Sequence, residues 1–158
     1  TLQITEFSAP PAIKQKVDVS HKIQFFPTLW SSFKSLNALP YVLANQERKE
    51  RGLDEIILLD ARGFISEAGA SNIFWVKGGT VYTPALSCCC INGVSRQVIV
   101  DHLYQNNISY VEGEFPISDL SDDKCVFVSN CTGISYLESY IDKKFSSKRL
   151  PFLKLIFD

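Results

Sequence analysis

Two pairs of short apolar strands follow one another in the middle of the sequence, and a turn that contains glycine joins the members of each pair. Residues 54–60 are followed by residues 64–67, and residues 72–76 are followed by residues 81–83. Turns this short connect neighbouring antiparallel strands, because parallel strands need a long crossover connection. The two hairpins therefore predict an antiparallel or mixed sheet.

Two helices are predicted beside the sheet. The first begins at Ser35 or Asn37, carries charged residues 47–51 on its solvent face and ends at Gly52, a residue typical of helix C-termini. Its apolar residues recur at intervals of three and four, which predicts a buried face made of Leu36, Leu39, Val42 and Leu43. The second helix opens at residues 93–95 and closes at residues 106–107.

The remaining segments complete an α+β pattern. Strands are predicted at residues 1–7, 16–26, 108–115, 125–128 and 136–141, a helical turn at 116–122, a polar loop at 129–133 and a terminal amphipathic helix at 148–157. We therefore expect a mixed, largely antiparallel sheet with flanking helices. The length of 158 residues is that of a single domain.

Charge and hydropathy exclude several classes of partner. The 16 basic residues nearly balance the 17 acidic ones, for a formal net charge of -1, so nothing steers the chain toward nucleic acid or acidic lipid. The apolar runs are far shorter than the ~20 residues that span a bilayer. We expect a protein with no membrane partner, located in the cytoplasm.

The five cysteines fit neither a disulfide framework nor a metal site. Their number is odd, no Cys-x-x-Cys spacing occurs, and three of them are adjacent, so they cannot readily surround one ion. We expect reduced, structural thiols in a reducing compartment and no bound metal. The residues are Cys88, Cys89, Cys90, Cys125 and Cys131.

The sequence begins at Thr1 and contains no methionine. It opens directly into a segment with the pattern of a strand. We therefore expect a piece of a longer chain.

Three features exceed what packing requires. Lys34 lies between apolar residues just before a helix, where burial and neighbouring cations would lower its pKa and let the amine react with an aldehyde. Glu67 ends an apolar strand and is followed by small residues, which leave room for a flat group. Residues 92–95 begin a helix, whose free N–H groups favour a phosphate. Alone, each has an ordinary interpretation as a surface lysine, a strand-end carboxylate or a helix cap.

Together, the amine, the acid and the anion site match the needs of pyridoxal phosphate, which has an aldehyde, a ring nitrogen and a phosphate. The combination resembles the class IV aminotransferase family, the fold-type IV pyridoxal-phosphate enzymes. The resemblance runs from about Phe33 to at least Gly133, on residues 33–37, 42–44, 63–67, 71–74, 81–84 and 93–96. It implies the larger domain of that fold, with a mixed sheet or pseudo-barrel.

The resemblance also implies roles for single residues. Lys34 would be the catalytic lysine that binds the cofactor aldehyde, and Glu67 would partner the ring nitrogen. The other cofactor-binding residues that it implies are Asn72, Gly93, Val94, Ser95 and, in the family's second phosphate loop, Cys131 or Thr132. Arg96 matches a position that is often arginine, and an ordinary ion pair explains it equally well.

Family members also have a smaller N-terminal domain that completes the active-site cleft. We expect residues 1–158 to form the single cofactor-binding domain, with residues 1–26 as the junction and first strands, and little or no turnover from this domain alone. The resemblance further implies a homodimer and a small-molecule amino substrate.

Three motifs look most similar to aminodeoxychorismate lyases, which release pyruvate and leave 4-aminobenzoate for folate synthesis. They are residues 34–37, 70–75 and 81–84. A D-amino-acid or branched-chain aminotransferase is the alternative. Branched-chain enzymes typically have a glycine-rich segment after the lysine, which this chain lacks. A non-catalytic binding or assembly module is the alternative of another class.

Overall fold

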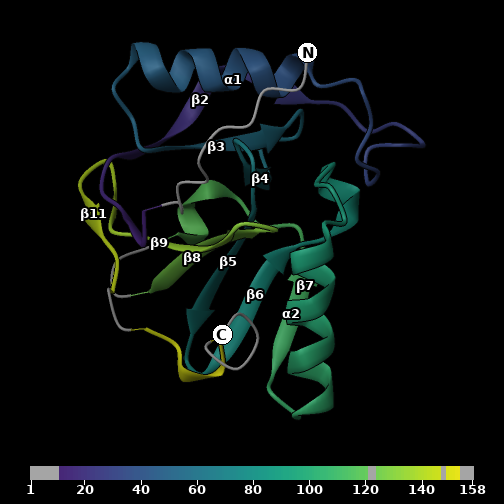
Figure 1. Cartoon of the computed structure of the whole chain (residues 1–158), viewed down its shortest axis with the longest axis vertical. Helices are drawn as coiled ribbons and strands as arrows, with labels where there is room; N and C mark the ends of the chain where they lie inside the picture. Colours follow the sequence, from purple (N-terminus) through teal and green to yellow (C-terminus); the bar gives the residue numbers. More distant parts are fainter. Residues whose placement is uncertain (1–10, 121–123, 147–148, 154–158) are drawn as a thin grey trace, which may run out of the picture.

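The computed structural model describes residues 11–120, 124–146 and 149–153, and Figure 1 shows two sheets with a helix on the outside of each. In the described part of the chain, six strands form the first sheet. Its spatial order is β1 (Ile13–Lys14), β9 (Gly133–Leu137), β8 (Cys125–Asn130), β5 (Asn72–Lys77), β6 (Thr80–Pro84) and β7 (Tyr110–Gly113).

The second sheet contains five described strands. Its order is β11 (Lys143–Lys144), β10 (Ser139–Tyr140), β2 (Val17–Phe25), β3 (Glu55–Asp60) and β4 (Ile65–Ala68). Both predicted hairpins are confirmed as antiparallel pairs, β3 with β4 and β5 with β6. Each lies in a different sheet, and both sheets also contain parallel pairs, such as β2 with β3 and β6 with β7. The predicted mixed α+β architecture is therefore confirmed.

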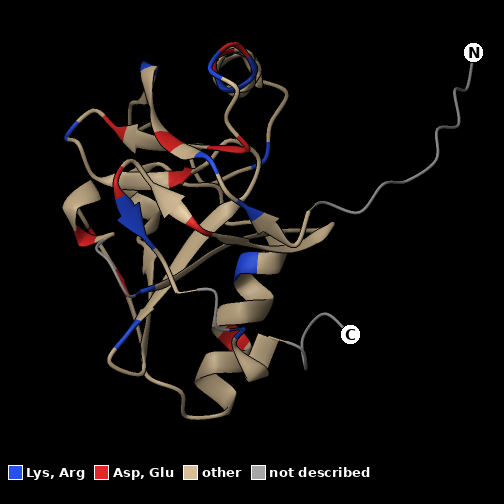
Figure 2. Cartoon of the chain, turned by 90° about the vertical axis from the view of Figure 1, so that its left-hand side faces the viewer, with Lys and Arg blue, Asp and Glu red and all other residues tan. Residues whose placement is uncertain are grey.

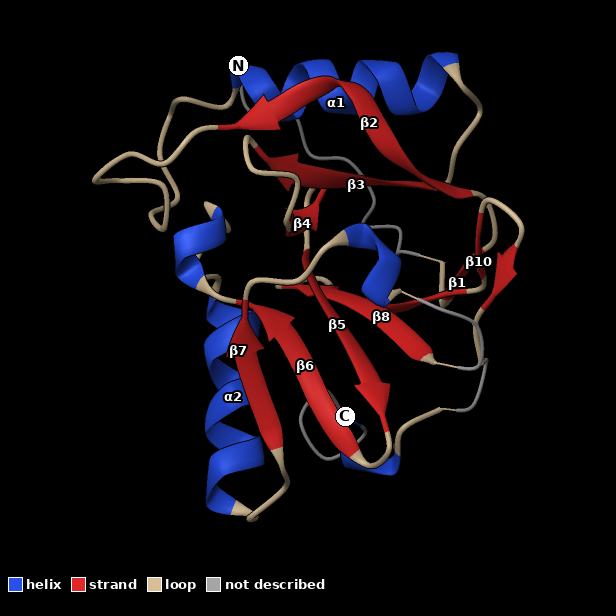
Figure 3. Cartoon of the chain, turned by 180° about the vertical axis from the view of Figure 1, so that it is seen from behind, coloured by secondary structure: helices blue, strands red, loops and turns tan. Residues whose placement is uncertain are grey.

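The helices cover the outer faces of the sheets, and the main core lies between the sheets. Helix α1 (Leu39–Glu50) packs on β2 and β3, and α2 (Val94–Gln105) packs on β8 and β7, as Figure 3 shows. The inner core joins residues of both sheets, among them Ile57, Trp75 and Val126. Two further clusters bury Ile99 of α2 and Ala44 of α1 against the outer faces.

Helix α1 ends as predicted, but the face that it buries is opposite to the predicted one. Gly52 has a φ of +62°, and the N–H groups of Gly52 and Leu53 donate to the carbonyls of Lys49 and Arg48, which closes the helix. The predicted buried face is wrong: Leu36, Leu39, Val42 and Leu43 are all exposed.

Glu47, which we expected on the solvent face, is only 1% exposed instead. Its carboxylate accepts hydrogen bonds from Ser20 Oγ at 2.6 Å, from His21 N at 2.8 Å and from Arg51 Nη1 at 2.9 Å. These donors compensate for the loss of water around the charge. They fix α1 to β2, where the strand's register with β3 shifts between Val19 and Gln24.

The end of the chain also differs from expectation. The predicted polar loop at 129–133 is wrong, because β8 continues to Asn130 and β9 begins at Gly133, leaving a tight turn. The predicted helix at 148–157 lies partly outside the described residues, and only 151–153 are described as helical. The strand expected at 1–7 lies outside them entirely.

Acidic and basic residues are mixed over the surface. Figure 2 shows both signs on α1, which is seen end-on at the top of that view. This distribution agrees with the near-zero net charge. Among the described residues, the longest apolar helical stretch falls short of what a bilayer crossing requires.

Candidate cofactor site

The candidate site lies where the chain passes from one sheet to the other. Strand β4 ends at Ala68 and β5 begins at Asn72, so the turn 69–71 carries the chain between the two sheets. A bridge between Ala68 and Ser71 closes this turn. The two predicted site residues Glu67 and Asn72 therefore stand on either side of the crossing.

A cavity of about 310 Å³ opens at this crossing. Its walls come from the segment before α1, from the β4–β5 turn, from the start of α2 and from the β8–β9 turn. The lining residues are Lys34, Tyr41, Glu67, Ala70, Ser71, Asn72, Ile91, Asn92, Gly93, Val94, Ser95, Ser129, Asn130 and Cys131. The structure thus brings together every predicted site residue except Thr132.

Glu67 is the buried acid of the cavity, with 3% of its surface exposed. Tyr41 donates its hydroxyl proton to Oε1 across 2.5 Å, and the N–H of Ile91 donates to Oε2 across 3.3 Å. Burial raises the pKa of Glu67 to about 7, although these two donors and the charge of Lys34 act in the other direction. The carboxyl group therefore titrates near neutral pH.

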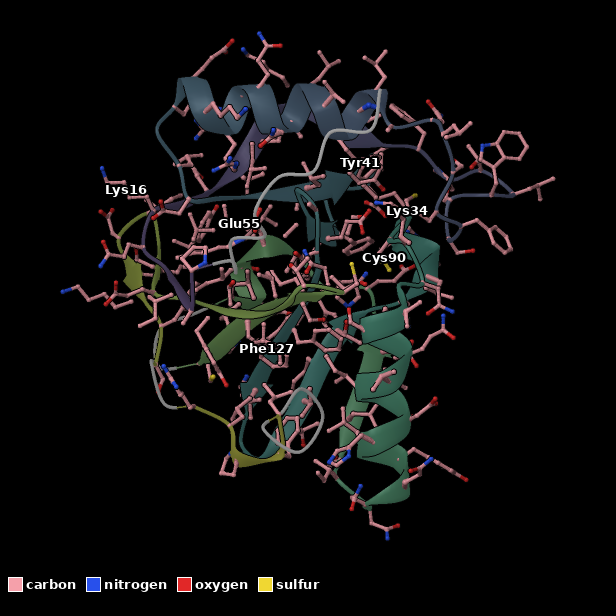
Figure 4. All side chains as sticks on the ribbon, in the orientation of Figure 1. Lys16, Lys34, Tyr41, Glu55, Cys90 and Phe127 are labelled. Carbon is pink, nitrogen blue, oxygen red and sulfur yellow. The ribbon has the colours of Figure 1, made fainter. Side chains whose placement is uncertain are left out.

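Lys34 approaches the cavity from the segment that precedes α1. Its Nζ lies 5.6 Å from the centre of the Tyr41 ring, and Figure 4 shows both side chains between α1 and the start of α2. The N–H of Asn92 donates to the carbonyl of Ser32 at 2.8 Å, which ties this segment to the loop before α2. The expectation that Lys34 is buried is wrong, because the residue is exposed.

The start of α2 faces the cavity without a capping side chain. Gly93 is its N-cap residue, no side chain caps it, and its first turn contains no acidic residue. Val94 and Ser95 follow on the cavity wall, and the Ser95 hydroxyl lies 3.3 Å from that of Ser129. Free N–H groups and the positive end of a helix dipole make such a terminus suited to a phosphate.

The β8–β9 turn distinguishes between the two residues predicted for the second phosphate loop. Cys131 lines the cavity, whereas the Thr132 hydroxyl donates to Asn130 Oδ1 at 2.6 Å. The Asn130 amide in turn donates to the carbonyl of Ala70 at 3.1 Å and to Ser71 Oγ at 3.0 Å. Thr132 therefore helps to hold two walls of the cavity together and does not line it.

Arg96 is buried and holds the loop before α2 in place. Its guanidinium forms an ion pair with Glu112 and donates to the carbonyl of Pro84 at 3.0 Å and to Asn92 Oδ1 at 3.3 Å. These contacts hold the loop that contains Cys88, Cys89 and Cys90, all buried. In the described part of the chain, no group of three acidic, histidine or cysteine residues is placed to hold a metal ion.

Sequence reasoning missed Tyr41 and Ile91. Tyr41 lies in the first turn of α1, where a lone aromatic residue looks like an ordinary packing residue. Ile91 contributes a backbone N–H group, and a side-chain pattern carries no information about it. Only the position of Ile91 two residues before Gly93, the predicted phosphate-binding start of a helix, pointed to this part of the loop.

The residues present fit pyridoxal phosphate. The cavity combines an exposed primary amine, a desolvated carboxyl group and an uncapped helix terminus beside a serine hydroxyl. These groups suit an aldehyde, a ring nitrogen and a phosphate respectively.

Comparison with known proteins gives similarities to aminotransferases and to a lyase. A family model described as amino-transferase class IV matches residues 1–137. The D-alanine aminotransferase of Listeria monocytogenes is 35% identical over 99 residues, which cover 63% of this chain and 34% of that protein. The aminodeoxychorismate lyase of Vibrio harveyi is 29% identical over 121 residues, which cover 72% of this chain and 45% of that protein.

The fold is also similar to a solved structure. The crystal structure of Escherichia coli branched-chain amino acid aminotransferase has a TM-score of 0.79 and 27% identity, over 92% of this chain and 50% of that one. The alignments thus span half or less of the length of each of these three proteins.

Proposed function

This chain belongs to the class IV aminotransferase family, a family of pyridoxal-phosphate-dependent enzymes, and we propose that its central cavity holds that cofactor. The observation that supports the proposal is the meeting of Lys34, Glu67 and the start of α2 around one cavity of about 310 Å³. Each of these groups comes from a different part of the fold.

Each end of the cofactor has a partner in this arrangement. The Lys34 amine would bind the aldehyde, and the Glu67 carboxylate would lie against the ring nitrogen. The N–H groups at Val94 and Ser95, with the Ser95 hydroxyl, would hold the phosphate. When bound, pyridoxal phosphate draws electrons away from the α-carbon of an amino substrate.

The side chains of this protein then have two tasks. Glu67 in its ionised form would keep a proton on the ring nitrogen, because its negative charge is buried and held in place by Tyr41 and Ile91. The Lys34 amine, on a flexible four-carbon stem, would act once the substrate amine has taken its place at the aldehyde: it would take the proton from the substrate α-carbon as a general base and return one as a general acid. Its exposed position leaves it room for that movement.

We propose that the reaction is the release of pyruvate from 4-amino-4-deoxychorismate, which gives 4-aminobenzoate. The motifs at residues 34–37, 70–75 and 81–84 support this proposal. The similarity to the Vibrio harveyi lyase, which covers 72% of this chain, supports it too. Transamination of an amino acid is the second candidate, favoured by the 35% identity to the D-alanine aminotransferase.

Product analysis separates the two reactions. Because we expect little turnover from this domain alone, the full-length enzyme that contains it is incubated with pyridoxal phosphate and aminodeoxychorismate, and pyruvate is measured. The proposal predicts pyruvate from the unaltered protein and from Lys49→Ala, whose lysine is exposed on α1, but none from Lys34→Ala. A keto acid formed from an amino acid only when α-ketoglutarate is added would instead establish the transaminase.

We further propose that residues 1–158 act as the cofactor-binding domain of a homodimeric enzyme. Large apolar side chains are exposed around Lys34, where a partner would cover them. They are Phe26, Leu29, Trp30, Phe33 and Leu36. Sedimentation equilibrium of the purified protein tests this proposal: a dimer that Trp30→Ser weakens supports it, and a monomer at all concentrations contradicts it.

A further inference from the structure

The Glu67 carboxylate depends on a residue from another element to hold one of its oxygens. Tyr41, in the first turn of α1, donates its hydroxyl proton to Oε1 across 2.5 Å. The donor to the other oxygen is a backbone N–H group, that of Ile91. Among the donors described at Glu67, Tyr41 is therefore the one that a single side-chain substitution removes cleanly.

The ring of Tyr41 is itself fixed between two groups. It packs against the ring of Phe25 of β2, with 5.2 Å between the ring centres, and its face lies under the Lys34 ammonium at 5.6 Å. A cation over an aromatic face is attracted to it. One side chain thus contacts the buried acid through its hydroxyl and the reactive amine through its ring.

We propose that Tyr41 is a positioning residue of this site, whose hydroxyl fixes the Glu67 carboxylate in its ionised form while its ring guides the Lys34 amine. This inference rests on the proposed cofactor function. A buried carboxylate needs hydrogen bonds to remain charged, because the surrounding protein solvates it poorly. Burial and the nearby Glu67 raise the pKa of Tyr41, so that the phenol remains a donor near neutral pH.

Among the residues that the structure describes, few other ionisable groups act on Glu67 and Tyr41. Lys34 stabilises the Glu67 charge, and the thiols of Cys89 and Cys90 lie close enough to influence Glu67 or Tyr41. Burial raises the pKa of both thiols, and that of Cys90 to about 12. The thiols are therefore neutral over the range in which Glu67 titrates.

Tyr41→Phe removes only the hydroxyl and keeps the ring against Phe25 and Lys34. A hydrogen bond to a charged group is worth enough that we expect roughly tenfold weaker binding of pyridoxal phosphate, measured by absorbance titration. The matched control is Tyr104→Phe, because Tyr104 is 74% exposed on α2. We expect the control to bind like the unaltered protein.

A second measurement needs no cofactor. The carboxyl resonance of carbon-13-labelled Glu67, assigned with Glu67→Gln, is followed against pH in the folded protein. We expect its pKa to rise in Tyr41→Phe from the value of about 7, and to stay unchanged in Tyr104→Phe. A residue that merely supports the fold would not move this titration.

The two measurements separate the inference from the function on which it rests. An unchanged Glu67 titration in Tyr41→Phe overturns the role of Tyr41, whatever happens to cofactor binding. If the unaltered protein fails to bind pyridoxal phosphate, the proposed function fails. The titration then still decides whether the hydroxyl controls the ionisation of Glu67.

Discussion

The side-chain oxygen of Asn72 occupies the space that a β-carbon on residue 93 would need. An ideal β-carbon built on Gly93 lies 2.5 Å from Asn72 Oδ1, well inside contact distance. The φ of Gly93 is −66°, so the backbone conformation does not require glycine here. Glycine leaves room for the Asn72 side chain of β5, which approaches the start of α2 this closely and places the predicted phosphate site against the β4–β5 crossing.

Gly93→Ala should weaken the binding of pyridoxal phosphate. The methyl group forces the Asn72 amide aside and disturbs its 2.7 Å hydrogen bond to the carbonyl of Ile91. Overpacking of this kind destabilises a fold by about 1–3 kcal/mol. We expect the part of this cost that displaces the phosphate-binding start of α2 to weaken the affinity roughly tenfold, which corresponds to about 1.4 kcal/mol. Absorbance titration with the cofactor measures it.

The control for this prediction is a double variant. If Asn72 causes the effect, Gly93→Ala combined with Asn72→Ala should lose less affinity than the sum of the two single losses, because both changes act on one contact. Strictly additive losses would show that the methyl group acts somewhere else.

The stability of the cofactor-free protein should decrease as the pH rises, because of Glu67. Its pKa is about 7 when folded, against an ordinary value of 4.5. Between these values the folded protein holds a proton that the unfolded chain has released, so a rise in pH favours unfolding. The stabilisation is complete below about pH 4.5 and is lost as pH passes 7.

Urea unfolding over this range measures the effect, with Glu67→Gln as the reference. The difference in slope should approach 1.4 kcal/mol per pH unit for one proton. Identical slopes in the two proteins would mean that Glu67 titrates normally and is not the desolvated acid described above.

Glu47→Ala should strongly destabilise the protein. The change leaves the donors of Ser20, His21 and Arg51 without their buried acceptor. Leaving such groups unpaired costs about 3 kcal/mol. Glu50→Ala is the matched control on the same helix, since its pair with Lys22 is exposed. Chemical unfolding should show little change for the control, and equal stability of the two variants would refute the buried anchor.

Cys131 should be the first cysteine to react with iodoacetamide. It is exposed on the cavity wall, whereas burial raises the pKa of Cys90 to about 12 and that of Cys125 to about 11. Bound pyridoxal phosphate should slow the labelling, because it would fill the space beside the thiol. Mass spectrometry of peptides identifies the labelled cysteine. Labelling of Cys131 at the same rate with and without the cofactor would show that Cys131 does not lie at the cofactor site.

Local pattern predicted the parts of the fold that local chemistry controls. The hairpins β3–β4 and β5–β6 and the start of α2 near Gly93 were all predicted because glycine turns and strand periodicity are encoded within a few residues. Which sheet each hairpin joins depends on contacts far along the chain, and the sequence pattern does not contain them.

The wrong predictions also arise from contacts between residues that are far apart along the chain. Helix α1 turns Glu47 inward because two donors on β2 and one on Arg51, the C-cap residue of the helix, bind its carboxylate there. The helical periodicity of the sequence instead assigns a charged residue to solvent. Tyr41 was missed because its role depends on Glu67, which lies on a different element. Lys34 was expected to be buried because it has apolar neighbours in sequence, yet those neighbours are exposed in the fold.

The measurement that tests the central claim most directly is borohydride reduction of the protein with pyridoxal phosphate, followed by peptide mapping. Reduction fixes the cofactor to whichever amine has bound its aldehyde. We predict the cofactor's mass on the peptide that contains Lys34, and its loss in Lys34→Ala but not in Lys49→Ala. Attachment at another lysine, or at none, would contradict the assignment of this cavity as the cofactor site.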